Sequence, residues 1–160
     1  MPLKSVYFQL STLIVMCFSL ISCGGSKKIA QNSSDDQDIV QYASSFIGTP
    51  YRYGGTSQRG MDCSGLIYQV YLGQGKALPR TTKDLSKYGQ KVKLNRARVG
   101  DLLFFKTSKK WGGINHVGLI TKIDRNAIEF IHSTSSRGVI LSDLSQNYWA
   151  ESFKYARRIL

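Results

Sequence analysis

Residues 60–67, Gly-Met-Asp-Cys-Ser-Gly-Leu-Ile, mark the point at which a glycine-containing loop gives way to a helix. Apolar residues continue at helical spacing as far as Tyr71, and Gly73 follows at the expected end. Cys63 is therefore expected at a helix N-terminus, where free backbone N–H groups and the helix dipole favour a thiolate. A lone thiol in this position is a candidate nucleophile.

Helices are expected before this segment and directly after it, and short strands beyond them. The first helix begins at Asp35 or Asp36 and ends at Gly48, and a short one is capped by Thr81 or Thr82. After Gly89 the sequence consists of short runs of β-prone residues separated by Gly and Asn. The expected strands are 92–94, 102–105, 116–123, 127–133, 139–141 and 155–159. Helices followed by meandering strands predict an α+β fold, with the N-terminal helices packed on an antiparallel sheet.

The only two histidines of the chain, His116 and His132, fall on neighbouring expected strands. In a hairpin centred on Asp124 they stand directly opposite each other on one face, with Cβ atoms about 5 Å apart. Cys63 then supplies the nucleophile, His116 its general base, and His132 the group that orients the first imidazole. Backbone N–H groups at the start of the Cys63 helix, helped by the Tyr51 hydroxyl, are candidates for oxyanion stabilisation.

The N-terminus is expected to be an export signal. Lys4 precedes a mostly apolar stretch over residues 6–21, which is short for a membrane span. Leu20-Ile21-Ser22-Cys23 resembles the lipobox of bacterial lipoproteins, in which cleavage leaves a lipidated cysteine. The expected organisation is a signal peptide over 1–22, a lipidated Cys23 with a flexible tether over 23–36, and one domain over 37–160. An uncleaved anchor is the alternative.

The formal net charge is +12, and residues 1–22 contribute only Lys4 to it. This balance favours polyanions. An export signal and the lack of a stripe of stacked aromatics argue against nucleic acid, so an anionic cell-wall polymer or lipid headgroups are the expected surroundings. If Cys17 is removed and Cys23 carries lipid, Cys63 has no intramolecular disulfide partner and remains a free, reactive thiol.

Several separated motifs, in order, resemble those of the NlpC family of bacterial cell-wall cysteine peptidases over roughly residues 37–160. The matching segments are 48–55 (Gly-Thr-Pro-Tyr-Arg-Tyr-Gly-Gly), 62–65 (Asp-Cys-Ser-Gly), 78–82 (Leu-Pro-Arg-Thr-Thr), 100–102 (Gly-Asp-Leu), 116–118 (His-Val-Gly) and 132–135 (His-Ser-Thr-Ser). The C-terminal part, from residue 138 onward, is most similar to the single-domain outer-membrane lipoproteins of that family. The stretch between the two histidines is a few residues longer than in those relatives.

The resemblance implies a papain-like fold and hydrolysis of peptide bonds in peptidoglycan stem peptides or crosslinks through an acyl-enzyme. It implies Cys63, His116 and His132 as the catalytic residues, and Tyr51 as the oxyanion-side tyrosine. Asp62 and Ser64 flank the nucleophile where relatives contact substrate, whereas Arg80 matches a family position without an assigned role. No cofactor or metal is implied. The expected location is the outer membrane, facing the periplasm, through the lipid anchor at Cys23.

Three alternatives stay open on the sequence. An amidase or an acyltransferase would use the same Cys/His chemistry, since all three reactions share the acyl-enzyme step. Cys63, His116 and His132 are also three possible ligands of an open zinc site, although no CxxC or HExxH spacing supports one. An inactive wall-binding scaffold is the last alternative. Within the peptidase hypothesis, the bond between D-alanine and the diamino acid and the bond after D-glutamate are both candidates.

Overall fold

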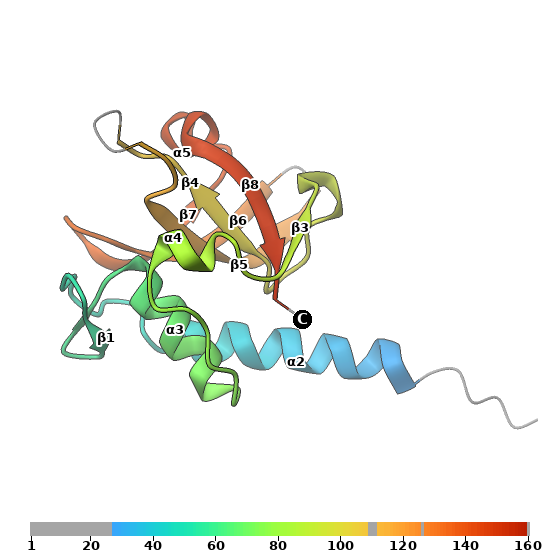
Figure 1. Cartoon of the computed structure of the whole chain (residues 1–160). Coiled ribbons are helices and arrows are strands. Elements are labelled where there is room, and N and C mark those ends of the chain that lie inside the picture. Colours follow the sequence, from blue (N-terminus) through green and yellow to red (C-terminus); the bar gives the residue numbers. More distant parts are fainter. Residues whose placement is uncertain (1–26, 109–111, 126, 160) are drawn as a thin grey trace, which may run out of the picture. The chain divides into compact units, whose positions relative to one another are not determined.

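The computed structural model describes residues 27–159 apart from 109–111 and 126, and the segment with the expected signal and Cys23 lies outside these residues (Figure 1). The elements, in chain order, are α2 (Lys27–Ser44), β1 (Thr56–Ser57), β2 (Gly60–Met61), α3 (Cys63–Gly73), α4 (Thr82–Leu85), β3 (Gln90–Val92), a 3-10 turn (Leu94–Arg96), β4 (Leu102–Phe105), β5 (His116–Asp124), β6 (Ala127–Thr134), β7 (Gly138–Asp143), α5 (Asn147–Ser152) and β8 (Phe153–Arg158). Among the described helices, none has the length and apolar character needed to cross a membrane.

The first helix begins earlier than the sequence predicts. The tether over 23–36 was expected to be flexible, but its described part is helical, since α2 begins at Lys27. Once packing of Ile39 and Ala43 in the core has fixed a helical turn, each further residue adds a hydrogen bond at little entropic cost, so the helix extends into a polar segment. At the other end the helix stops at Ser44, before the predicted end at Gly48, and Ile47 beyond it is 48% exposed.

The helix that carries the nucleophile is confirmed at both ends. Asp62 is its N-cap, with an extended backbone and a side chain that accepts a hydrogen bond from the Gly65 N–H at 2.7 Å. The helix ends at Gly73, and Gly75 follows at a φ of +72°. Cys63 is thus the first residue of α3.

Six strands form one sheet in the order β3-β8-β4-β5-β6-β7, and all neighbouring strands are antiparallel. Together with the preceding helices this confirms the predicted α+β class. The strand β4 has the predicted bounds, whereas the short helix α5 between β7 and β8 was not predicted.

The β5–β6 hairpin corrects the predicted register of the histidines. At the tip Asp124 pairs with Ala127, but an irregularity between Ile120 and Lys122 shifts the pairing by one residue, and Leu119 then pairs with Ile131. In this register His116 and His132 are diagonal neighbours and not directly opposite residues. With the register of the tight turn alone, the two imidazoles would lie on opposite faces of the sheet. The one-residue shift at the bulge reverses this, so both imidazoles lie on one face.

The alternation of side chains along the strands divides the core into two layers. On one face of the sheet Leu102, Phe104 and Leu119 pack against apolar residues of α3, such as Leu66 and Ile67. The opposite face carries another cluster, whose members are Leu103, Phe105, Ile120, Phe130, Leu144, Trp149 and Ala156. In Figure 1, α3 and α5 accordingly lie on opposite sides of the sheet. The N-terminus of α3 and the first residue of β5 meet beside a cavity, described next.

Candidate active site

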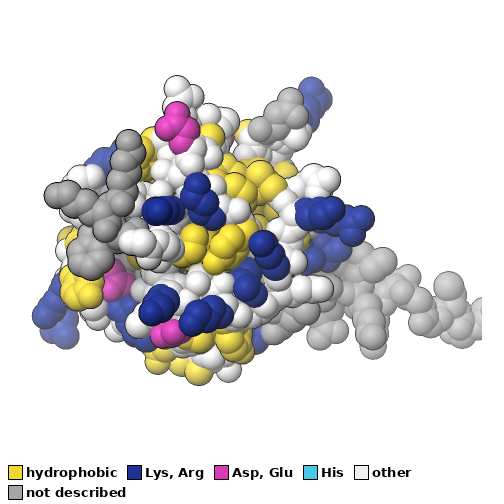
Figure 2. All heavy atoms as spheres, turned by 45° about the horizontal axis from the view of Figure 1, so that its top comes forward, with side chains coloured by type: hydrophobic (Ala, Val, Ile, Leu, Met, Phe, Trp, Pro, Cys, Tyr) yellow, Lys and Arg dark blue, Asp and Glu magenta, His cyan; other side chains and the backbone are white. Residues whose placement is uncertain are grey.

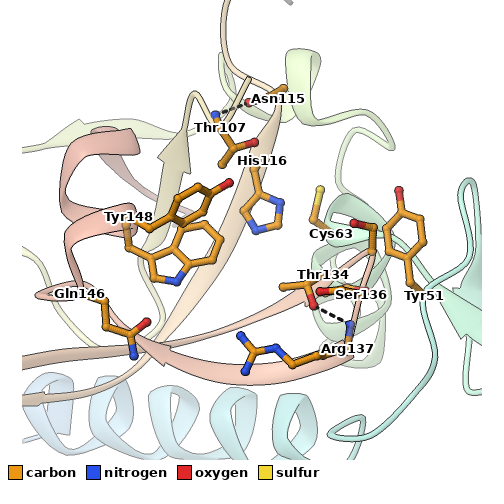
Figure 3. Close-up of a pocket in the computed structure, with 13 residues that line it drawn as sticks. Tyr51, Cys63, Thr107, Asn115, His116, Thr134, Ser136, Arg137, Gln146 and Tyr148 are labelled. Atoms are coloured by element: carbon orange, nitrogen blue, oxygen red, sulfur yellow. Dashed lines mark hydrogen bonds between the residues drawn. The ribbon is translucent and has the colours of Figure 1, made fainter. Parts of the chain in front are cut away.

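A cavity of about 500 Å³ opens where α3 begins, and both Cys63 and His116 line it. In Figure 3 the Cys63 side chain is drawn between the His116 ring and the Tyr51 ring. Hydroxyl-bearing residues at the end of β6 and in the following turn, Ser133 to Ser136, form another part of the wall. The structure therefore brings together the predicted nucleophile, the predicted base and the predicted oxyanion-side tyrosine.

The Cys63 sulfur has weak hydrogen-bond partners, and the residue is half-buried at the edge of the cavity. Its Sγ lies 3.5 Å from Thr82 Oγ1. Burial, aided by the negative charge of Asp62, raises the pKa of the thiol, and hydrogen bonds from Thr82 and from the backbone of Val117 only partly offset this rise. The resting group is thus a neutral thiol, which corrects the expectation that the helix N-terminus alone would favour the thiolate.

Asp62 and Ser64, the predicted substrate contacts, belong to a network behind the cavity and are not among its lining residues. Both Asp62 oxygens accept hydrogen bonds from the Arg80 guanidinium at 2.9 Å. The same carboxylate accepts from the backbone N–H groups of Gly54 and Gly65, each at 2.7 Å. Arg80 also donates to the Ser64 hydroxyl at 3.0 Å.

This network gives Arg80 a structural role that the sequence left open. Burial alone would raise the pKa of Asp62, but the Arg80 hydrogen bonds and those from the two backbone amides lower it below its ordinary value. The carboxylate therefore stays charged and joins the 54–55 loop to the start of α3. Gly65 allows this close approach, because a Cβ at that position would collide with the Gly55 carbonyl oxygen.

The two histidines are joined to each other and to a third side chain. His116 Nε2 lies 2.9 Å from His132 Nδ1. His132 Nε2 in turn lies 2.8 Å from Ser142 Oγ, and both His132 and Ser142 are buried. Ser142 follows from the β6–β7 register, since it pairs with Phe130 and is thus diagonal to His132. Ser142 could not be predicted from the sequence, because no spacing rule singles out one serine on a later strand.

Both imidazoles are neutral at physiological pH. Burial lowers the pKa of His116 to about 4. Burial also lowers the pKa of His132 to about 3, with further contributions from the charges of His116 and Arg137. Each ring consequently carries one proton, and the hydrogen-bond chain determines which nitrogen holds it.

A tryptophan from the unpredicted helix α5 supports the histidine pair. The Trp149 ring stacks on His116 at a centroid distance of 5.4 Å and meets the His132 ring edge-on at 4.6 Å. Phe130 packs against His132 from its own strand, at 4.8 Å. These contacts fix both ring planes and keep water from one side of the pair. Because α5 has only six residues, it is too short to show a helical pattern of apolar residues, and the sequence did not reveal Trp149.

The arrangement disfavours the zinc alternative. No group of three His, Cys, Asp or Glu side chains within the described ranges is placed to hold a metal ion. Both ring nitrogens of His132 already have hydrogen-bond partners, in His116 and Ser142, so neither presents a free lone pair to a cation.

Comparison with known proteins places these features in one family. The model of the NlpC/P60 family matches residues 48–158. The "Probable endopeptidase NlpC" of Escherichia coli strain K12 is 36% identical over 154 residues, covering 92% of this chain and 97% of that protein. The "Murein DD-endopeptidase MepS/Murein LD-carboxypeptidase" of the same strain is 32% identical over 135 residues, covering 84% of this chain and 68% of that protein.

Solved structures agree with the sequence comparison. An NlpC/P60 family protein from Bacillus cereus ATCC 10987 superposes with a TM-score of 0.69 at 32% identity. The match covers 78% of this chain but only 40% of that longer chain.

Proposed function

This chain belongs to the NlpC/P60 family of cysteine peptidases, and we propose that it is a peptidoglycan endopeptidase that hydrolyses peptide bonds in cell-wall stem peptides or crosslinks. The papain-like fold and the endopeptidase names of its relatives support this function. The observation that carries it is that the Cys63 thiol and His116 line one cavity, while Nε2 of His116 is hydrogen-bonded to His132.

In the proposed reaction the hydrogen-bond chain prepares His116 as a base. Its Nε2 is engaged by His132, which leaves Nδ1 to accept the Cys63 proton. For this, His116 Nε2 must carry the ring proton and donate a hydrogen bond to His132 Nδ1. His132 then holds its own proton on Nε2 and donates to Ser142 Oγ. His132 thus orients His116 in the productive tautomer.

Acylation and deacylation follow from this arrangement. The Cys63 sulfur attacks the scissile carbonyl carbon while its proton passes to His116, and the imidazolium then protonates the departing amine as the C–N bond breaks. Water, deprotonated by His116, attacks the thioester and releases the carboxylic acid and the thiol. The N–H groups of Cys63 and Ser64, which have no intrahelical acceptor, and the Tyr51 hydroxyl are the proposed oxyanion donors.

The surroundings of the reaction are the bacterial cell envelope. We propose that Cys23, in its lipobox-like tetrapeptide, carries a lipid that anchors the chain to the outer membrane, facing the periplasm. Lys and Arg side chains are spread over the face in Figure 2 and outnumber acidic ones there, so the surface suits an anionic wall. Globomycin treatment of producing cells should yield an uncleaved precursor, and Cys23→Ser should move the protein from the membrane fraction to the soluble fraction.

Digestion of purified sacculi tests the reaction itself. The wild-type chain should release muropeptides whose new termini, identified by mass spectrometry, lie within the peptide. Cys63→Ser should reduce turnover by at least about 10³-fold, because the hydroxyl is a far weaker nucleophile at this site. Unchanged thermal unfolding would show that the variant folds. New termini at the glycan–peptide link would identify an amidase instead, and turnover retained by Cys63→Ser would refute the thiol mechanism.

A further inference from the structure

The turn between β6 and β7 places a cation in the wall of the cavity. Arg137 follows the hydroxyl-bearing residues 133–136, is exposed, and lines the same cavity as Cys63 and His116. In Figure 3 its side chain is drawn below the His116 ring and points toward Gln146. A substrate that fills this cavity would therefore meet both the thiol and this guanidinium.

Hydrogen bonds hold the backbone of this turn, so the point from which the Arg137 side chain extends is set before any ligand binds. The Arg137 N–H donates to Thr134 Oγ1 at 3.1 Å, and the Thr134 hydroxyl donates to the Gly138 carbonyl at 3.2 Å. Gly138 has a φ of +66°, and a Cβ there would collide with the Thr49 carbonyl oxygen. Two backbone hydrogen bonds of 2.9 Å tie Val139 to Gly48 and Thr49, so the turn is fastened to the loop that carries Tyr51.

The charge of Arg137 is not compensated by the protein around the cavity. No aspartate or glutamate is among the described residues that line it, and Arg137 is its one charged side chain there. The two ion pairs of the described part of the chain use other arginines, Arg80 with Asp62 and Arg158 with Asp101. Arg137 also lowers the pKa of His132, the hydrogen-bond partner of His116, so its positive charge disfavours protonation of that second histidine.

We propose that Arg137 binds a carboxylate that the substrate peptide carries beside the scissile bond, and that it thereby selects peptides with a free carboxylate over their carboxamides. This inference rests on the proposed peptidase function. A guanidinium presents two parallel N–H donors to a carboxylate, and the bound anion would also offset the positive charge near His132. The same group would thus contribute to binding and to the chemical step.

Three sources can supply such a carboxylate in a stem peptide, and matched peptides separate them. One peptide is amidated at the α-carboxylate of the γ-linked glutamyl residue, a second at the side-chain carboxylate of the diamino acid, and a third at the C-terminus. For one of these the wild type should show a kcat/KM about tenfold below that of the free acid. Arg137→Gln should lose this preference, with both forms cleaved at equal rates, and Arg137→Lys should retain part of it.

Lys122→Gln is the matched control for net charge, because Lys122 is exposed on β5, six residues and about 20 Å from His116. It should keep the wild-type preference. Arg137→Gln should also shift the acidic limb of the kcat/KM profile to higher pH, since a positive charge near His132 is removed. Equal loss on acid and amide, or an unchanged preference, in Arg137→Gln would overturn the inference. Absence of turnover by the wild type on every peptide would instead contradict the proposed function.

Discussion

At the nucleophile, burial outweighs the features that would favour a charged sulfur. The N-terminus of α3, Thr82 and the backbone of Val117 all stabilise a thiolate, yet desolvation and the neighbouring Asp62 raise the pKa of Cys63. The same burial lowers the pKa of His116 to about 4. The resting pair is therefore a neutral thiol and a neutral imidazole. Proton transfer belongs to the catalytic step, and it depends on the tautomer of His116.

The Ser142 hydroxyl is expected to control that tautomer through His132. In Ser142→Ala the buried His132 Nε2–H loses its acceptor. The tautomer with the proton on Nε2, which leaves Nδ1 free to accept from His116, is therefore less stabilised. We expect kcat/KM to fall by about tenfold, in line with the loss of one buried hydrogen bond. Ser142→Thr should restore most of it. Nitrogen-15 NMR of the His132 ring should show an altered tautomer ratio in the alanine variant.

Ser86→Ala is the matched control for this prediction. Ser86 is also buried, and its hydroxyl donates to the Lys83 carbonyl at 2.7 Å, away from the histidines. The control should lose stability similarly and leave the tautomer unchanged. If Ser142→Ala kept wild-type kcat/KM and an unaltered tautomer, Ser142 would have no positioning role.

At the scale of the elements, local signals predicted more than long-range ones. The start of α3 was predictable because a capping residue and helical periodicity act within a few residues, and β4 was predictable as a short apolar run. The hairpin register was not, because the bulge after Ile120 depends on packing across the whole sheet. The bonds of His132 to Ser142 and of Asp62 to Arg80 join distant segments, so the sequence could name the residues but not the partners.

The start of α3 is also the element whose stability we expect to depend most on one ion pair. Arg80→Met leaves the Asp62 carboxylate largely buried without its cation, and should destabilise the domain by about 2 kcal/mol, reduced from the buried-pair value because Arg80 is 33% exposed. Asp62→Asn should also destabilise it, since the amide NH₂ would face one of the N–H donors from Gly54 and Gly65. Urea unfolding of both variants measures these losses.

The double variant Asp62→Asn/Arg80→Met completes the test. Because the two side chains interact directly, its loss should be smaller than the sum of the single losses by on the order of 1 kcal/mol. Strict additivity would mean that the pair contributes nothing to the start of α3. Activity should fall with stability in all three variants, since the same network positions Cys63.

For the whole molecule, the buried histidine pair makes the free energy of unfolding depend on pH. Unfolded histidines bind protons near pH 6.5, whereas burial lowers the pKa of His116 to about 4 and that of His132 to about 3 in the folded chain. As the pH falls from 7 toward 4.5, the unfolded state binds protons that the folded state does not bind, so the free energy of unfolding decreases. The expected loss is on the order of 5 kcal/mol for the two histidines together, and urea unfolding at stepped pH measures it. The chain has no other histidine, so His132→Asn should roughly halve the slope. Acidic groups such as Asp62, whose pKa is lowered, lose their stabilising charge only below this window. A stability that stays flat from pH 7 to 4.5, or a slope unchanged in His132→Asn, would contradict a neutral, buried pair.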